Sequence, residues 1–138
     1  MKRLSPIAVT TASHTVLAAI LCFVPLFNLL GYEFCFATSL LAAITGVVLG
    51  MTWPIHHRPV LASVFQAGLL SILQLIPGLL LICGNALRVR NCDFVAGFEF
   101  FALLPIPTAL YGTTVGLAAN RLFLWIFIFS GNVVWLLV

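Results

Sequence analysis

The sequence predicts an all-α, polytopic integral membrane protein: a bundle of about five transmembrane helices with almost no soluble part. Of its 138 residues, 63% are hydrophobic and only 7% are charged, and the mean hydropathy is +1.23. Soluble domains carry about 25% charged residues, because a surface in water needs them. Six basic and three acidic side chains cannot cover a globule of this size, so most of the surface must face lipid.

The first expected span covers residues 6–30 and is followed by a short turn at 31–33. Lys2 and Arg3 could begin a signal peptide, but the apolar stretch is much longer than a signal-peptide core of about 7–15 residues. No small residue stands directly before Cys22, which argues against lipoprotein cleavage. We therefore interpret this stretch as a retained helix, with Pro25 near its end.

The second span is expected at 34–53 and the third at 60–83, each with the roughly 20 apolar residues that crossing the bilayer requires. The turn at 31–33 is so short that the first two spans must form an antiparallel hairpin. The polar loop between the second and third spans is bracketed by Pro54 and Pro59, which suit a helix end and a helix start.

The fourth span is expected at 94–119, after the longest polar segment, and the fifth at 122–138, after a turn at Asn120-Arg121. Pro105 and Pro107 each remove an amide donor, so the fourth helix should be kinked or broken there. The fifth span has no polar flank after Val138. Either it barely reaches the far surface, or the sequence is the N-terminal part of a longer chain.

Loop charges predict the orientation. With a cytoplasmic N-terminus, four basic residues lie inside and two outside: Lys2, Arg3, Arg58 and Arg121 against Arg88 and Arg90. The short loops favour a bacterial inner membrane. Expected partners are the lipid bilayer and other membrane subunits or copies of the chain itself. No nucleic acid is expected, because no basic run exceeds two residues.

Three polar residues within spans are candidates for a transport or proton pathway: Glu99, Gln66 and Gln74. A carboxylate inside a membrane is costly, and it often marks an ion or proton path. The alternative for Glu99 is a carboxylate that pairs with loop arginines. The alternative for the two amides is hydrogen bonding between packed helices.

His14 is a weak candidate for binding a haem or pigment, since an imidazole can ligate such a metal. A hydrogen bond to a neighbouring helix is the simpler explanation, and no cofactor or protein-bound metal is predicted. Cys83 and Cys92 flank the longest loop and could form a disulfide in an oxidising compartment. The alternative is that Cys83 is a small packing residue and Cys92 a free thiol.

Small residues spaced by four predict close helix contacts in the second and fourth spans. They are Ala42, Gly46 and Gly50 in the second span, and Gly112 and Gly116 in the fourth. Such spacing lets two helix backbones approach each other within lipid.

No sequence motif of a hydrolase, a metalloprotease or a nucleotide-binding protein is present. We therefore expect a non-catalytic membrane module, either an accessory subunit of a larger complex or the anchor of a longer protein. The alternative is a small oligomeric transporter or channel that uses Glu99 and the broken fourth helix. A third possibility is an intramembrane enzyme or pigment-binding subunit built around His14.

Overall fold

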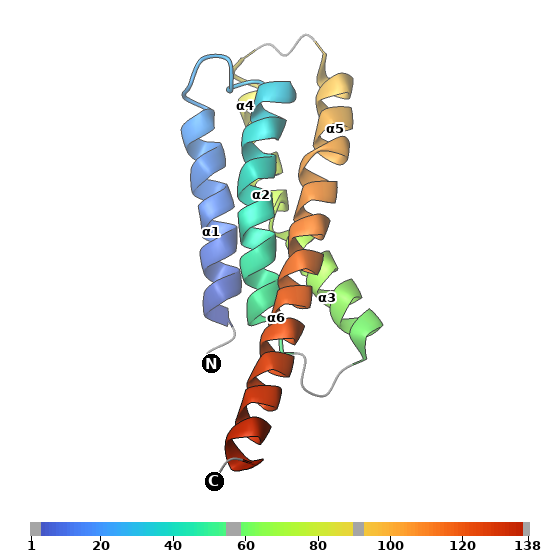
Figure 1. The fold of residues 1–138 in the computed structure, drawn as a ribbon. Coiled ribbons are helices and arrows are strands. Elements are labelled where there is room, and N and C mark those ends of the chain that lie inside the picture. Colours follow the sequence, from blue (N-terminus) through green and yellow to red (C-terminus); the bar gives the residue numbers. More distant parts are fainter. Residues whose placement is uncertain (1–3, 55–58, 90–92, 137–138) are drawn as a thin grey trace.

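The computed structural model describes residues 4–54, 59–89 and 93–136, and the side chains of residues 6–54, 59–89 and 93–125. This part of the chain contains helices and no strands (Figure 1). The helices are α1 (Leu4–Leu21), α2 (Tyr32–Thr52), α3 (Val60–Leu73), α4 (Ile76–Asn85), α5 (Phe94–Leu103) and α6 (Pro105–Leu136).

The first helix is shorter than the sequence predicted, because it ends at Leu21 rather than near residue 30. Phe23 and Val24 bond back only three residues, to the carbonyls of Ile20 and Leu21, as in the tighter last turn of many helices. Pro25 follows and has no amide proton to continue the ladder. Leu26 then adopts a positive φ of 81°, which turns the chain towards α2.

The second helix matches the expected range except at its start, because Tyr32 and Glu33 already belong to it. The third expected span consists of two helices, α3 and α4, separated by Gln74 and Leu75. Pro77 lies in the first turn of α4, where its missing amide proton is tolerated. The interruption just before this proline leaves Gln74 at the joint between α3 and α4.

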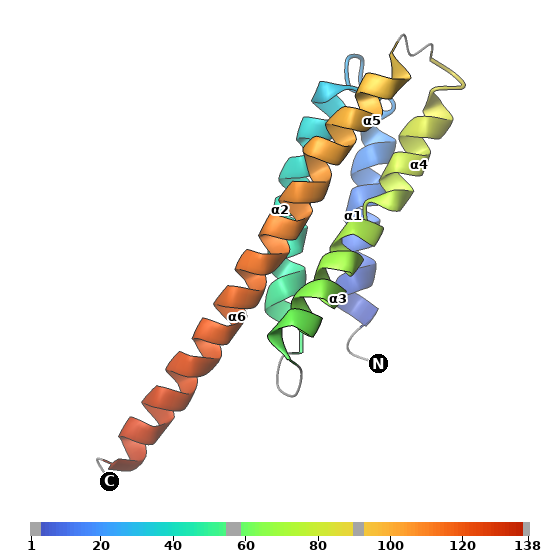
Figure 2. The same cartoon turned by 90° about the vertical axis from the view of Figure 1, so that its right-hand side faces the viewer.

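The fourth expected span is also two helices, but the interruption is a single residue, Leu104. Pro105 begins α6, so its missing amide proton costs little. α5 and α6 continue in nearly the same direction (Figure 2). The predicted kink or break at Pro105 and Pro107 is therefore not confirmed beyond this one interrupted residue.

The predicted turn at Asn120-Arg121 is wrong, because α6 runs through both residues. The Asn120 side chain instead donates hydrogen bonds from Nδ2 to the carbonyl oxygens of Trp53, at 2.9 Å, and Gly50, at 3.4 Å. Both carbonyls lie in the last turn of α2, where helix carbonyls run out of amide partners, although Gly50 O also accepts from the Trp53 amide at 3.3 Å. Asn120 is thus a cap for a neighbouring helix and not a turn residue.

Three helical segments of the described chain are long and apolar enough to cross a membrane: Tyr32–Thr52, Val60–Asn85 and Phe94–Trp125. The apolar helix Pro6–Leu21 is shorter. The protein is therefore all-helical and compatible with integral membrane localisation, whereas the predicted number of five spans is not confirmed.

The helices form an up-and-down bundle (Figure 1). α2 packs mainly against α6, while α1 packs against α4 and α2, and α3 packs against α6. The connection between α1 and α2 lies at the same end of the bundle as the end of α4 and the start of α5. At this end, the guanidinium of Arg88 lies over the Phe23 ring, 5.7 Å from its centroid. The start of α1, the end of α2 and the start of α3 lie at the opposite end.

The contact between α2 and α6 is made largely by glycine backbones. A Cβ added to Gly46 would lie 2.7 Å from the carbonyl oxygen of Ala109. One added to Gly112 would collide with the carbonyl oxygen of Ala43, and one added to Gly116 with that of Val47. The predicted close contacts of these small residues are therefore confirmed, and the two helices are each other's neighbours.

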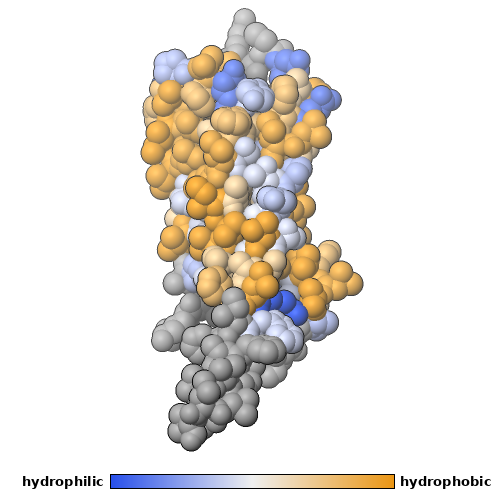
Figure 3. Space-filling model, viewed as in Figure 1, coloured by the Kyte–Doolittle hydropathy of each residue, from blue (hydrophilic) through white to orange (hydrophobic). Residues whose placement is uncertain are grey.

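Large apolar side chains cover the outside of the bundle, as expected of helices that face lipid. Leu61, Phe65, Phe23 and Leu87 are each at least 70% exposed. In Figure 3, hydrophobic residues cover most of the visible face, and the strongly hydrophilic ones lie towards its two ends.

Substitution of Gly112 by Ala should destabilise the protein by about 1–3 kcal/mol, because the new methyl group must push α2 and α6 apart. The matched control is Gly84→Ala, since a Cβ at Gly84 meets no atom within 4 Å. This control should be neutral or slightly stabilising, because alanine favours helices. Thermal unfolding in detergent measures both, and equal unfolding temperatures for the two variants would contradict the backbone contact.

Candidate functional site: a buried polar cluster

Most buried hydroxyl groups in the bundle are satisfied within their own helix. Thr38 donates to Phe34 O at 2.9 Å, and Ser71 donates to Gly68 O at 2.7 Å. Thr113, which is 1% exposed, donates to Ala109 O at 2.8 Å. Such bonds keep a hydroxyl group satisfied in an apolar interior but connect no helices.

One buried hydroxyl group does connect helices, that of Thr45 on α2. Its oxygen lies 2.9 Å from His14 Nε2 on α1 and 3.5 Å from Gln74 Nε2 at the joint between α3 and α4. All three side chains are at most 5% exposed. We call His14, Thr45 and Gln74 the polar cluster.

The hydrogen bonds around Thr45 indicate which nitrogen of His14 carries the proton. A threonine hydroxyl group has one proton and two lone pairs. The proton is directed to Leu41 O, 2.9 Å away. The lone pairs can then accept from the Gln74 amide and from a protonated Nε2 of His14. This arrangement favours the neutral tautomer with its proton on Nε2.

The local sequence explains how each member of the cluster reaches the interior. Thr45 is one of the buried residues of α2 and lies three residues after Ala42, which is buried as well. Gln74 occupies the joint between α3 and α4. α4 lies close to α1, since a Cβ at Gly78 would be 3.4 Å from Ala18 Cβ and 3.6 Å from His14 O.

The chemistry open to this cluster is limited. Among the described residues, no group of three or more His, Cys, Asp or Glu side chains could hold a metal ion. In the tautomer favoured above, Nε2 of His14 carries the proton and donates to Thr45, so the lone pair of the imidazole is on Nδ1. Whether His14 binds a haem or pigment stays a prediction. The hydrogen bonds of the polar cluster connect α2 to α1 and to the joint between α3 and α4.

The structure separates the three residues suggested for a transport pathway. Gln74 is buried in the polar cluster, whereas Gln66 on α3 and Glu99 on α5 are exposed. The hydrogen bond of Gln74 joins it to Thr45, a residue that the sequence analysis did not single out. Whether Glu99 and Gln66 act in transport stays a prediction.

The predicted disulfide between Cys83 and Cys92 also stays a prediction, because Cys92 lies outside the described residues. Cys83 is half-buried near the end of α4. Cys35 is buried, and its thiol lies 3.8 Å from Gly97 O. Because a Cβ at Gly97 would collide with Leu30 O, the start of α5 is packed tightly against the segment that leads into α2.

Two residues that tie the bundle together were missed by the sequence analysis, Thr45 and Asn120. A weak signal for Thr45 was its position three residues after Ala42, because residues three apart lie on nearly the same side of a helix. The signal for Asn120 was weaker, because an amide beside an arginine is as typical of a turn as of a helix cap.

Comparisons with protein-family models, with curated proteins and with solved structures gave no match. The function of the chain must therefore be argued from its own residues.

Replacement of Thr45 by Val should cost about 1–3 kcal/mol of stability, because it removes the acceptor of two interhelical bonds and leaves a buried imidazole N–H unpaired. Thr113→Val is the matched control, since that hydroxyl group bonds only within α6. Its effect should be much smaller. Unfolding of both variants in a denaturing detergent series measures the difference, and an equal cost would show that the cluster does not connect the helices.

Proposed function

We propose that this chain is a non-catalytic multi-pass membrane module, an accessory subunit that docks against other membrane subunits or the anchor of a longer protein. The observation that carries the proposal is the position of Glu99. Its side chain is exposed on α5, and it forms neither an ion pair nor a hydrogen bond with any described residue.

The depth of Glu99 makes this exposure costly. It lies six residues after Asp93, the N-cap of α5, which is about 9 Å along the helix at a rise of 1.5 Å per residue. A carboxylate that faces acyl chains is expensive, and such groups normally face another protein element or water. Arg90, one of its predicted partners, lies outside the described residues. The other, Arg88, lies over Phe23.

The surface around Glu99 is large and apolar. Val95 and Leu103, one helical turn to either side, are each 71% exposed, and so is Tyr111 further along α6. Exposed side chains continue beyond Arg121 with Leu122 and Phe123, at 63% and 66%. A docking surface with an apolar body and a single carboxylate would suit a partner helix that supplies a hydrogen-bond donor.

The length of α6 supports the same proposal. Its 32 residues extend about 48 Å at 1.5 Å per residue, well beyond a hydrocarbon core of about 30 Å. Arg121 lies beside Val60 at the start of α3, and Figure 2 shows α6 continuing past this end of the bundle. We propose that the part of α6 beyond Arg121 packs against a partner subunit.

The membrane and orientation are part of the proposal. We propose a bacterial inner membrane with the N-terminus in the cytoplasm. The support is the distribution of basic residues along the sequence, since Lys2 and Arg3 precede α1, Arg58 comes between α2 and α3, and Arg121 lies beside the start of α3. An excess of basic residues is typical of the cytoplasmic side.

The proposal can be tested by extracting the native membrane in a mild detergent. Native electrophoresis and mass spectrometry then show which proteins migrate with this chain. Stoichiometric co-migration with other membrane subunits is expected. Glu99→Lys should reduce this co-migration at least tenfold, because it places a cation opposite the donor of the partner. The control, Glu33→Lys in the first turn of α2, should leave co-migration intact. A wild-type chain that migrates alone as a monomer would contradict the proposal.

A second candidate function, a small oligomeric transporter or channel, is favoured by the same exposed carboxylate. In that case copies of this chain would surround Glu99, and Glu99→Gln would abolish ion or proton flux in vesicles while leaving the oligomer intact. Retained flux and an intact oligomer in Glu99→Gln would remove this function.

A further inference from the structure

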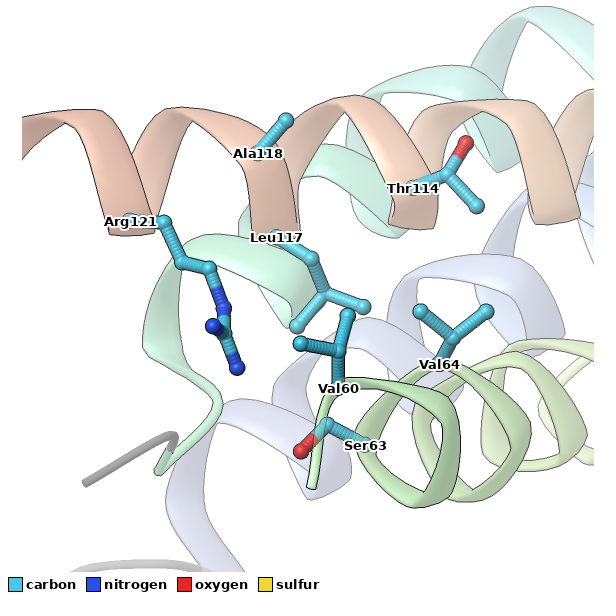
Figure 4. Close-up of a pocket in the computed structure, with 7 residues that line it drawn as sticks. All are labelled: Val60, Ser63, Val64, Thr114, Leu117, Ala118 and Arg121. Atoms are coloured by element: carbon cyan, nitrogen blue, oxygen red, sulfur yellow. The ribbon is translucent and has the colours of Figure 1, made fainter. Parts of the chain in front are cut away.

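A small hollow lies between α3 and α6, at the end of the bundle where α3 begins (Figure 4). Its volume is about 230 Å³. The lining residues are mainly apolar or small: Val60, Ser63, Val64, Thr114, Leu117, Ala118 and Arg121. Figure 4 shows Arg121 extending from α6 towards the side of the hollow at which α3 begins.

The two hydroxyl groups in this hollow are already used within their own helices. Ser63 Oγ donates to Pro59 O at 3.3 Å, and Thr114 Oγ1 donates to Tyr111 O at 2.8 Å. The guanidinium of Arg121 is therefore the main polar donor that the hollow offers. Leu117 and Val64 form its apolar wall and belong to a small packed cluster with Ala67 and Trp53.

No acidic residue of the chain belongs to this end of the bundle. The three acidic residues are Glu33 in the first turn of α2, Asp93 at the start of α5, and Glu99. All three belong to the opposite end, about the length of α2 away. Arg121 thus has a positive charge that no acidic side chain of the described residues neutralises, beside an apolar hollow.

We propose that this hollow binds one anionic phospholipid. Arg121 would pair with the lipid phosphate, and an acyl chain would lie along Val64 and Leu117. Thr114 is seven residues from Arg121, about 10 Å deeper along α6 at 1.5 Å per residue, so the groove leads from the charged group into the apolar layer. Basic pockets between transmembrane helices recognise anionic headgroups in this way. The site is at the other end of the bundle from Glu99, so variants of Arg121 test it separately from the proposed contact of Glu99.

The test uses the full chain, purified in mild detergent and mixed with equal amounts of phosphatidylglycerol and phosphatidylcholine. Native mass spectrometry then gives the ratio of the two lipids in the first bound position. The wild type should prefer phosphatidylglycerol. Arg121→Gln should lower this preference about fivefold, the factor that corresponds to ~1 kcal/mol per basic residue at a membrane surface. Arg121→Lys should retain most of it.

Two further variants separate a specific site from general attraction. Arg88→Gln removes one charge at the opposite end and should leave the lipid ratio unchanged. Ala118→Phe fills the hollow from an exposed position without altering any charge, and it should reduce the amount of tightly bound lipid. Unfolding temperatures equal to that of the wild type confirm that both variants are folded.

Three results would overturn the inference. The first is an equal loss of preference in Arg121→Gln and Arg88→Gln, which would indicate net charge alone. The second is unchanged lipid retention in Ala118→Phe. The third is displacement of the lipid by excess inorganic phosphate, which would indicate a site for small anions without a role for the acyl chain.

Discussion

Helices in lipid gain little from burying apolar side chains against one another, because acyl chains are as apolar as leucine. Close backbone packing must supply much of the association instead. In this bundle it does so where α2 meets α6, since Gly46, Gly112 and Gly116 leave no space for a Cβ. The other helices are arranged around this pair. α1 packs on α2, and α3 packs on α6.

The same apolar surroundings explain the polar residues of the interior. A buried polar group without a partner is costly where no water can replace the missing bond. Hydroxyl groups on single helices solve this locally by bonding to a carbonyl one turn back. Other polar groups connect elements: Thr45 joins α1 to the joint of α3 and α4, and Asn120 caps α2 from α6. Asn85 likewise donates to Asn28 O at 2.7 Å and holds the connection after α1.

The charged groups that can contact other molecules lie on the outer surface of the bundle. The polar cluster is occupied in holding helices together, so the groups that remain available for other molecules lie on the outside. Glu99 faces outward near one end, and Arg121 adjoins a hollow near the other. Their opposite charges suit different neighbours, a donor on another membrane protein for Glu99 and an anionic headgroup for Arg121. Both proposals describe a protein that acts through what it binds in the membrane.

The sequence alone determined the helical class and the apolar exterior, because composition decides which solvent a surface can face. It also indicated the close contacts at Gly46 and Gly112, since small residues spaced by four lie on one side of a helix. It misplaced the end of the first helix and predicted a turn at Asn120 that is absent. Pro105 and Asn120 show the reason. Whether a proline interrupts a helix depends on where the helix begins, and whether an asparagine turns the chain depends on which carbonyls lie near its amide. The polar cluster likewise required the tertiary structure, because His14, Thr45 and Gln74 are far apart in the chain and meet only when their helices pack.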